Sequence, residues 1–259
     1  MHTASVTINQ PPQLVITANA NPVLICQGDI TNLSVSGAST YNWSNGLGNG
    51  ITVTASPTIT TTYTVTGSDT IGCTATTEVT VSVNPTPDIS PTSDQTLCHN
   101  TQTTAINFTS SVPNTVFNWI NNNSSIGLAA NGTGDISSFT VTNTGTAPQT
   151  STIVTPSFTN NGLTCTGQSD TFLIIVNPTP DISPTSDQTL CHNTQTTAIN
   201  FTSSVPNTVF NWINNNSSIG LAANGTGDIS SFIVTNTGTA PQTSTIIVTP
   251  SFTNNGLTS

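Results

Sequence analysis

Apolar and polar residues alternate at every second position along most of this chain, and no helix-period stripe is present. Such alternation predicts short strands with one buried face and one solvated face. In the first third of the chain, where turn signals such as Asn45-Gly46 separate them, the expected strands are Ser5–Ile8, Val23–Cys26, Leu33–Ser36, Tyr41–Trp43, Ile51–Thr54, Thr62–Thr66 and Thr77–Val83. This density of short strands is typical of a β-sandwich.

A long repeat follows. Residues 83–164 return almost letter for letter as residues 176–258. The two copies differ where Thr140 becomes Ile233, and where one isoleucine is inserted at Ile246-Ile247. The offset between the copies suits one small domain and is too long for a solenoid turn. A verbatim second copy adds little to catalysis but lengthens an array, so the repeat predicts an extended series of modules.

The repeated sequence predicts strands of the same kind. In its first copy they are Ala105–Phe108, Val116–Ile120, Ser138–Val141, Thr152–Val154 and Thr171–Val176. The inserted isoleucine in the second copy shifts a strand by one residue, which exchanges its two faces unless a bulge absorbs the shift. The sequence therefore predicts a bulge near Ile246-Ile247, or local disorder there.

These patterns divide the chain into four segments. Residues 1–12 look like the last strand of a preceding module, residues 13–84 form one sandwich module, residues 85–177 form the first repeat, and residues 178–259 form a second repeat that stops before its last strand. The Asn-Pro-Thr-Pro linkers favour extended backbone, so we expect an extended rod. The incomplete ends have two interpretations: a window cut from a longer protein, or head-to-tail assembly in which one chain's terminal strand completes the next chain's sheet.

The composition removes several classes of function. The chain has no Lys or Arg among its 259 residues, a formal net charge of −10 and 4% charged residues. Nucleic-acid backbones are held by Lys and Arg, so nucleic-acid binding is not expected. Catalysis through a lysine Schiff base, a phosphate-binding lysine or an arginine finger is excluded. The sequence has no stretch of eighteen apolar residues, so no membrane insertion is expected, and residues 1–3 do not open a signal peptide.

Five cysteines are spread over the modules: Cys26, Cys73, Cys98, Cys165 and Cys191. Their order predicts two bridges, Cys26–Cys73 and Cys98–Cys165, each within one module. Cys191 is then left unpaired, because Ser259 stands where the counterpart of Cys165 would recur. The alternative is five free, buried thiols. Bridges of this kind imply an oxidising compartment.

Three tryptophans occupy equivalent places. Trp43 and Trp119 each lie between the first and second cysteine of a module, and Trp212 is the copy of Trp119. A Trp packed near an inter-sheet bridge forms the core of many immunoglobulin-like sandwiches. We therefore expect these side chains in the core rather than exposed for ligand stacking, and an all-β fold of tandem immunoglobulin-like β-sandwich modules.

Candidate chemistry is sparse. His99 and His192 each follow a cysteine and precede an asparagine, but a thiol protease collects these residue types from distant segments, so no catalytic residue is expected. Asp88 and Asp94 lie near the start of the repeat and could bind Ca²⁺ at a module joint with backbone carbonyls. Calcium sites usually collect several carboxylates, however. A solvated turn or a cap is the stronger interpretation, and no cofactor or catalytic metal is expected.

Several short motifs, taken in their order, resemble a known family over nearly the whole chain. The immunoglobulin-like repeats of giant cell-surface adhesins of Bacteroidota are similar to Cys26–Asp29, Tyr41–Gly46, Thr61–Thr66 and Gly72–Ala75. The PKD-like repeats of the same proteins, which include gliding-motility adhesins, resemble Asn84–Pro87, Phe117–Trp119, Val154–Pro156 and Cys165–Gly167. The chain departs from the family where Leu163-Thr164-Cys165 replaces the common Gly-Cys.

The resemblance implies export by type IX secretion, anchoring through a C-terminal region outside this sequence, and an extracellular place on the bacterial cell surface. It carries over no catalytic residues. Asp69-Thr70-Ile71 also resembles the Asp-Ser/Thr-aliphatic signal for O-glycosylation in Bacteroidota, which makes Thr70 a candidate glycan site.

Together these observations predict a structural repeat region of an extracellular adhesin. It would act as a stalk or spacer, with weak polar surfaces that add by multivalency, in cell adhesion or gliding. The expected partners are neighbouring modules of the same long chain, and surface polysaccharide or like chains. The alternative is a subunit of a self-assembling extracellular filament or sheath. An enzyme is not expected.

Overall fold

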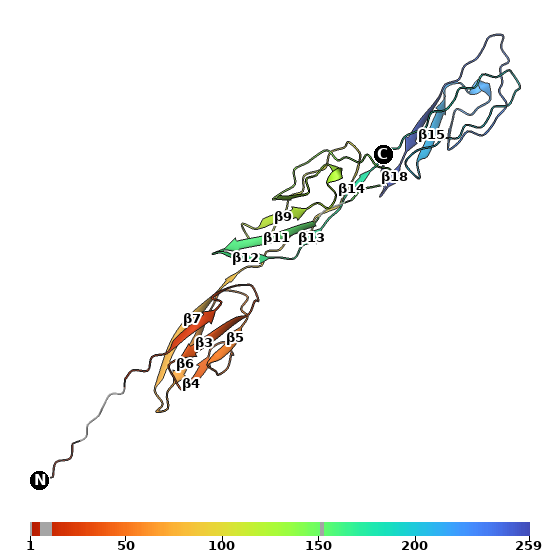
Figure 1. Cartoon of the computed structure of the whole chain (residues 1–259). Coiled ribbons are helices and arrows are strands. Elements are labelled where there is room, and N and C mark those ends of the chain that lie inside the picture. Colours follow the sequence, from red (N-terminus) through yellow and green to blue (C-terminus); the bar gives the residue numbers. More distant parts are fainter. Residues whose placement is uncertain (1, 6–11, 151–152) are drawn as a thin grey trace. The chain divides into compact units, whose positions relative to one another are not determined.

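The structure is a computed structural model that describes residues 2–5, 12–150 and 153–259. Within those ranges the regular elements are strands, apart from two short 3-10 helices, η1 (Ser124–Ile126) and η2 (Ser217–Ile219) (Figure 1). The predicted all-β class is therefore confirmed. The chain forms two compact units, one of residues 1–89, 109–116 and 155–168, and one of residues 90–108, 117–154 and 169–259.

Seven strands of the first unit come from its N-terminal part: β1 (Thr17–Asn21), β2 (Leu24–Cys26), β3 (Thr31–Ser36), β4 (Thr40–Trp43), β5 (Thr52–Ala55), β6 (Thr61–Ser68) and β7 (Thr74–Asn84). One sheet has the order β1-β3-β5 and the other the order β2-β7-β6-β4. All neighbours are antiparallel except β2 and β7, which run parallel. Two small sheets joined in this way form the expected immunoglobulin-like sandwich.

The two sheets enclose one core because apolar side chains alternate along each strand. Leu33 and Val35 of β3 are buried together with Trp43, Val65 and Val81 of the other sheet. Strand β1 is the one that the sequence pattern missed, since its residues Thr-Ala-Asn-Ala-Asn carry no large apolar side chain. The predicted strand Ser5–Ile8 falls mostly on residues 6–11, which lie outside the described part.

The tryptophans are core residues. Trp43, Trp119 and Trp212 are 3%, 7% and 7% exposed. The indole Nε1 of Trp43 donates a hydrogen bond to the carbonyl of Gly50 (3.0 Å), and that of Trp119 donates to Gly134 (3.1 Å). Trp212 Nε1 is buried and finds no partner among the described residues. None of these rings offers a free face for stacking on a ligand.

The repeated sequence contributes the other strands: β8 (Gln95–Cys98), β9 (Val116–Ile120), β10 (Asn131–Thr133), β11 (Ile153–Asn160), β12 (Leu163–Thr166), β13 (Asp170–Thr171), β14 (Ile174–Asn177), β15 (Val209–Asn214), β16 (Asn224–Thr226), β17 (Ile246–Ser251), β18 (Thr253–Asn254) and β19 (Leu257–Thr258). In the second unit β8 pairs in parallel with β14, β9 pairs with β10, and β15 lies between β16 and β17. Its buried aromatic residues include Phe108, Phe172, Phe201 and Phe210.

Two predicted strands of the repeat are not strands. Ala105–Phe108 and Ser138–Val141 make only isolated bridges. A side chain takes one backbone donor in each place: Phe108 N–H donates to Asp135 Oδ1 (2.8 Å), and Phe139 N–H donates to Thr103 Oγ1 (3.0 Å). Polar side chains that satisfy backbone groups locally compete with sheet pairing, and the alternation of apolar residues does not reveal them.

The predicted bulge at the inserted isoleucine is wrong. Strand β17 pairs with β15 in an unbroken register from Asn214↔Ile246 to Val209↔Ser251. Beyond the insertion the two copies agree, because Ser251 Oγ donates to the Val209 carbonyl (3.3 Å) as Ser157 Oγ does to Val116 (3.3 Å). The extra residue is therefore accommodated in β17 without a bulge. The predicted strand Thr152–Val154 begins at Ile153 in the structure, and Thr152 lies outside the described residues.

Candidate functional site: a stapled hairpin

The first unit contains a hairpin that comes from the repeat. Strands β11 and β12 pair from Ser157↔Thr166 to Asn160↔Leu163, and this hairpin belongs to the same unit as residues 1–89. Its turn residues Asn161 and Gly162 have φ of 51° and 80°, the conformation that an Asn-Gly hairpin turn favours. The hairpin thus brings β12 to the ends of β2 and β7.

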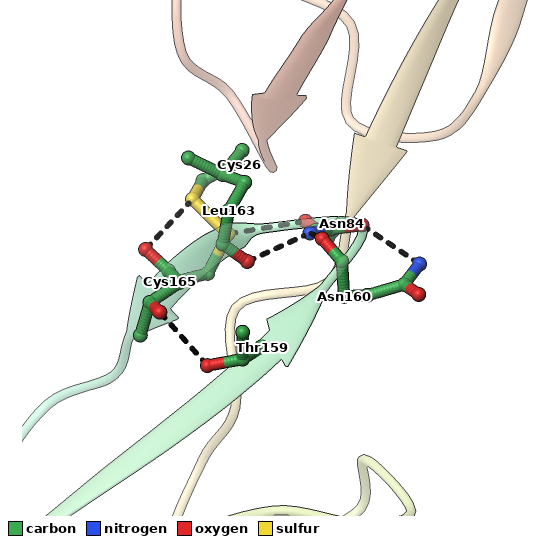
Figure 2. Close-up of a disulfide and its surroundings, with 7 residues drawn as sticks. Cys26, Asn84, Thr159, Asn160, Leu163 and Cys165 are labelled. Carbon is green, nitrogen blue, oxygen red and sulfur yellow. Dashed lines mark hydrogen bonds between the residues drawn. A yellow bond between two sulfur atoms is a disulfide. The ribbon is translucent and has the colours of Figure 1, made fainter.

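A disulfide fastens this hairpin. Cys26, the last residue of β2, is bonded to Cys165 of β12, with 5.6 Å between their Cα atoms and 139 residues between them in sequence (Figure 2). Both predicted bridges are therefore wrong in their pairing. Cys73, Cys98 and Cys191 are free, and of these only Cys191 is exposed rather than half-buried.

The length of β7 explains why Cys26 does not bond to Cys73. Cys26 pairs in register with Asn84 at the end of β7, whereas Cys73 directly precedes its first residue, Thr74. An 11-residue strand separates the two places. At about 3.3 Å per residue this is roughly 35 Å, far beyond the Cα separation of about 7 Å that a disulfide spans. A bridge within the module was plausible from sequence order alone, but the strand positions forbid it.

Asn84 forms a second, non-covalent connection to the hairpin. Its Nδ2 donates to the carbonyls of Asn160 (3.0 Å) and Leu163 (3.2 Å), and its Oδ1 accepts from Asn160 Nδ2 (3.2 Å). Gln27 N–H donates to the Asn84 carbonyl (3.0 Å). Asn84 is 2% exposed, and a buried amide is tolerated because its polar atoms are satisfied in this way. We call Cys26, Asn84, Asn160, Leu163 and Cys165 the stapled site (Figure 2).

A tight turn presents Cys26 to the hairpin. The Asp29 N–H donates to the Cys26 carbonyl (3.0 Å), and Gly28 between them has φ of 82°. Glycine adopts this left-handed conformation without steric cost. The sequence marked Cys26–Asp29 as a motif and Asn84 as part of a linker, but it did not show that the two meet.

The histidines are structural. His99 Nδ1 accepts a hydrogen bond from the backbone N–H of Asn143 (2.9 Å), and His192 Nδ1 accepts one from Asn236 (3.0 Å). Each ring therefore fastens the loop that lies 44 residues further along the chain. This hydrogen bond gives each ring a structural role.

The acidic residues cap loops. Asp88 Oδ1 accepts from Ser110 Oγ and Ser111 N–H (both 2.7 Å), and Asp94 Oδ1 accepts from Leu173 N–H (2.8 Å). The Ser110 hydroxyl, followed by the Ser111 N–H, lowers the pKa of Asp88. Across the described residues no three His, Cys, Asp or Glu side chains lie close enough together to hold a metal ion. A calcium ion at a joint, through Asp88 or Asp94, stays a prediction.

Asp170 gives a pH-dependent prediction. Its Oδ2 accepts from the N–H and Oγ1 of Thr92 (both 2.9 Å), and the Thr92 N–H is the main cause of a lowered pKa for Asp170. A lowered folded-state pKa stabilises the fold above the unfolded value of about 3.9, and this contribution is lost as the pH falls through the folded pKa. We expect Asp170→Asn to lower the urea midpoint at pH 7, and the difference from the wild type to vanish near pH 2. The exposed Asp187→Asn is the control, and a difference that persists at low pH would contradict the assignment.

Thr70 is exposed on the loop between β6 and β7. Asp69 Oδ1 fixes this loop by accepting from the N–H groups of Ile71 (2.9 Å) and Cys73 (2.8 Å). The Thr70 hydroxyl is therefore accessible to a modifying enzyme, and the glycan there stays a prediction.

Within the described residues, no helix is both long enough and apolar enough to cross a membrane.

Comparison with known proteins gives structural likeness only. No protein-family model and no curated protein sequence matches the chain. Its structure is similar to DIP-gamma IG1+IG2 (10% identity, TM-score 0.32, covering 60% of this chain and 93% of that one) and to Sidekick-1 immunoglobulin domains 1–4 (11% identity, TM-score 0.34, covering 88% and 72%). It is also similar to murine CEACAM1b (11% identity, TM-score 0.28, covering 63% and 100%). At these values the likenesses say nothing of what this chain binds.

Proposed function

We propose that this chain is a structural repeat region of an extracellular adhesin, serving as a stalk that holds a binding region at a distance. The observation that carries the proposal is the stapled site, where a disulfide and a buried asparagine fasten the β11–β12 hairpin to the ends of β2 and β7. A covalent connection between strands far apart in sequence resists unfolding, which suits a stalk. The disulfide also favours an oxidising, extracellular setting.

Two finer proposals rest on the sequence resemblance. The chain would belong to a surface adhesin of the Bacteroidota gliding type, exported by type IX secretion, with a glycan on Thr70. Its partners would be neighbouring modules, surface polysaccharide or like chains. The weakly charged, threonine-rich strand faces support this proposal, because many weak polar contacts along a stalk add by multivalency. We propose no catalytic activity and no cofactor.

The filament is the second candidate because one copy of a strand sequence is unpaired in the described part of the chain. Residues 188–191 have the same sequence as β8, yet they form no strand there. An unpaired segment of this kind can accept a strand from another chain.

Electron microscopy of the purified chain in negative stain separates the two candidates. The stalk proposal expects single short beaded particles at every protein concentration. Long ordered polymers that lengthen with concentration would favour the filament instead. A compact globule with both repeats around one shared pocket would contradict both.

A further inference from the structure

The second unit contains a site with the same plan as the stapled site. In the parallel pair β8–β14, Cys98 stands in register with Asn177, just as Cys26 stands in register with Asn84 in β2–β7. His99 N–H donates to the Asn177 carbonyl (3.1 Å), matching the bond from Gln27 to Asn84. The Cys98 carbonyl accepts from Thr101 N–H (3.2 Å), which closes the same tight turn.

A hairpin also covers this second site. Strands β18 and β19 repeat the sequence of the β11–β12 hairpin and lie in the same unit as Cys98. Asn254 Nδ2 donates to Asn177 Oδ1 (3.1 Å), and Asn177 Nδ2 donates to the Leu257 carbonyl (3.4 Å). Asn177 is fully buried. The asparagine connection of the stapled site is therefore present again.

The two sites differ in the partner of their cysteine. The Cys98 thiol donates to the Thr258 carbonyl (3.5 Å) and contacts the hydroxyl of Ser259. In the stapled site, Cys26 Sγ lies 3.8 Å from the matching carbonyl of Thr164 and is bonded to Cys165. Ser259 thus occupies the place of Cys165, with an oxygen where a bond-forming sulfur would be.

We propose that Cys98 and Asn177 form a second hairpin-docking site, and that Cys98 forms a disulfide with the docked hairpin whenever that hairpin carries cysteine at the position of Ser259. The bond requires an oxidant, for which a low-molecular-weight disulfide such as oxidised glutathione suffices. One protein thiolate attacks it and releases one glutathione thiol. The second protein thiolate then attacks the mixed disulfide and releases the other, so that two thiols are oxidised and one disulfide is reduced. This inference does not rest on the proposed stalk function.

Cys191 is a matched comparison within the same chain. It lies in the same Cys-His-Asn-Thr sequence as Cys98, and its carbonyl accepts from Thr194 N–H (3.1 Å) in the same turn. It is exposed, whereas Cys98 is half-buried under the hairpin. Any difference in reactivity between the two thiols therefore reports the packing of β14 and the hairpin around Cys98, and not the local sequence.

The first experiment measures alkylation by iodoacetamide of two folded variants, Cys191→Ser and Cys98→Ser. Cleavage before aspartate releases residues 94–134 and 187–227 as peptides of identical sequence, so each variant leaves a single thiol in that sequence, which mass spectrometry quantifies. We expect Cys98 to react at least about tenfold more slowly than Cys191, since only exposed thiolates react freely. Equal rates would show that the hairpin does not cover Cys98, and would overturn the docking site.

The second experiment uses Ser259→Cys in a glutathione redox buffer, once combined with Cys191→Ser and once with Cys98→Ser, because peptides 94–134 and 187–227 have the same sequence. With Cys191→Ser, we expect a bond between peptides 94–134 and 228–259 in most molecules. The control is Thr258→Cys, one residue earlier, whose side chain points to the opposite face and whose hydroxyl pairs with Thr253 Oγ1 (2.8 Å). That variant should carry glutathione instead of a bridge. The proposal would be overturned by glutathione on the introduced thiol of Ser259→Cys combined with Cys191→Ser, by a bridge in Ser259→Cys combined with Cys98→Ser, or by a bridge in Thr258→Cys combined with Cys191→Ser. Circular dichroism of the reduced proteins verifies that every variant is folded.

Discussion

Replacing Cys165 and Cys26 together by serine should lower the free energy of unfolding of the first unit by about 4–5 kcal/mol. The bond closes a loop with a sequence separation of 139 residues, and closing a loop of this size removes much conformational freedom from the unfolded chain. The double substitution avoids a new free thiol. Because no other disulfide is present among the described residues, the first unit has no second bond to compensate.

Hydrogen exchange read by mass spectrometry measures this effect unit by unit, which is necessary because a chain with two compact units need not unfold in one step. Faster exchange should be confined to the first unit, above all to β12 and β2. Cys191→Ser removes an exposed, unbonded thiol and should leave exchange unchanged. If the double variant exchanged as slowly as the wild type, the disulfide would have no stabilising role.

Asn84→Ala should cost about 2–4 kcal/mol even with the disulfide intact. The substitution removes the donor to the Asn160 and Leu163 carbonyls and the acceptor for Asn160 Nδ2. Each buried polar group left unpaired costs about 1–3 kcal/mol. Cys165 should then remain bonded, while the hairpin loses its fixed position.

The measurement is the urea midpoint of the first unit, followed by hydrogen exchange. Asn19→Ala, on an exposed position of β1, is the matched control and should change stability by less than about 0.5 kcal/mol. An Asn84→Ala protein as stable as this control would show that the disulfide alone holds the hairpin.

Period-two alternation predicted most strands of the first sandwich, since each has one buried face. It located β3, β4, β6 and β7 with ends that differ from the structure by only a few residues. It failed on β1, whose side chains are small, and on Ala105–Phe108, where the Asp135 side chain takes the backbone donor of Phe108. The segment boundaries at 84 and 177 remain predictions.

The stapled site could not be predicted in the same way. Pairing Cys26 with Cys73 followed from their order in the sequence, but disulfide pairing depends on where strands end, and an 11-residue strand places these two cysteines at opposite ends. One signal was available. Asn84 and Asn177 each directly follow a predicted strand and directly precede a proline. Each asparagine belongs to a site only because it stands in register with a cysteine on a parallel strand. The local sequence does not show this register.

The covalent link between β2 and β12 also determines how this chain responds to tension. A pull on residues outside Cys26 and Cys165 passes through the sulfur atoms and bypasses the sequence between them, which includes β7 and the proline linker. Those 139 residues of separation would reach roughly 450 Å if drawn out at about 3.3 Å each. While the disulfide is intact, the chain between the two cysteines cannot be extended by tension. Reduction of the disulfide would allow this segment to extend.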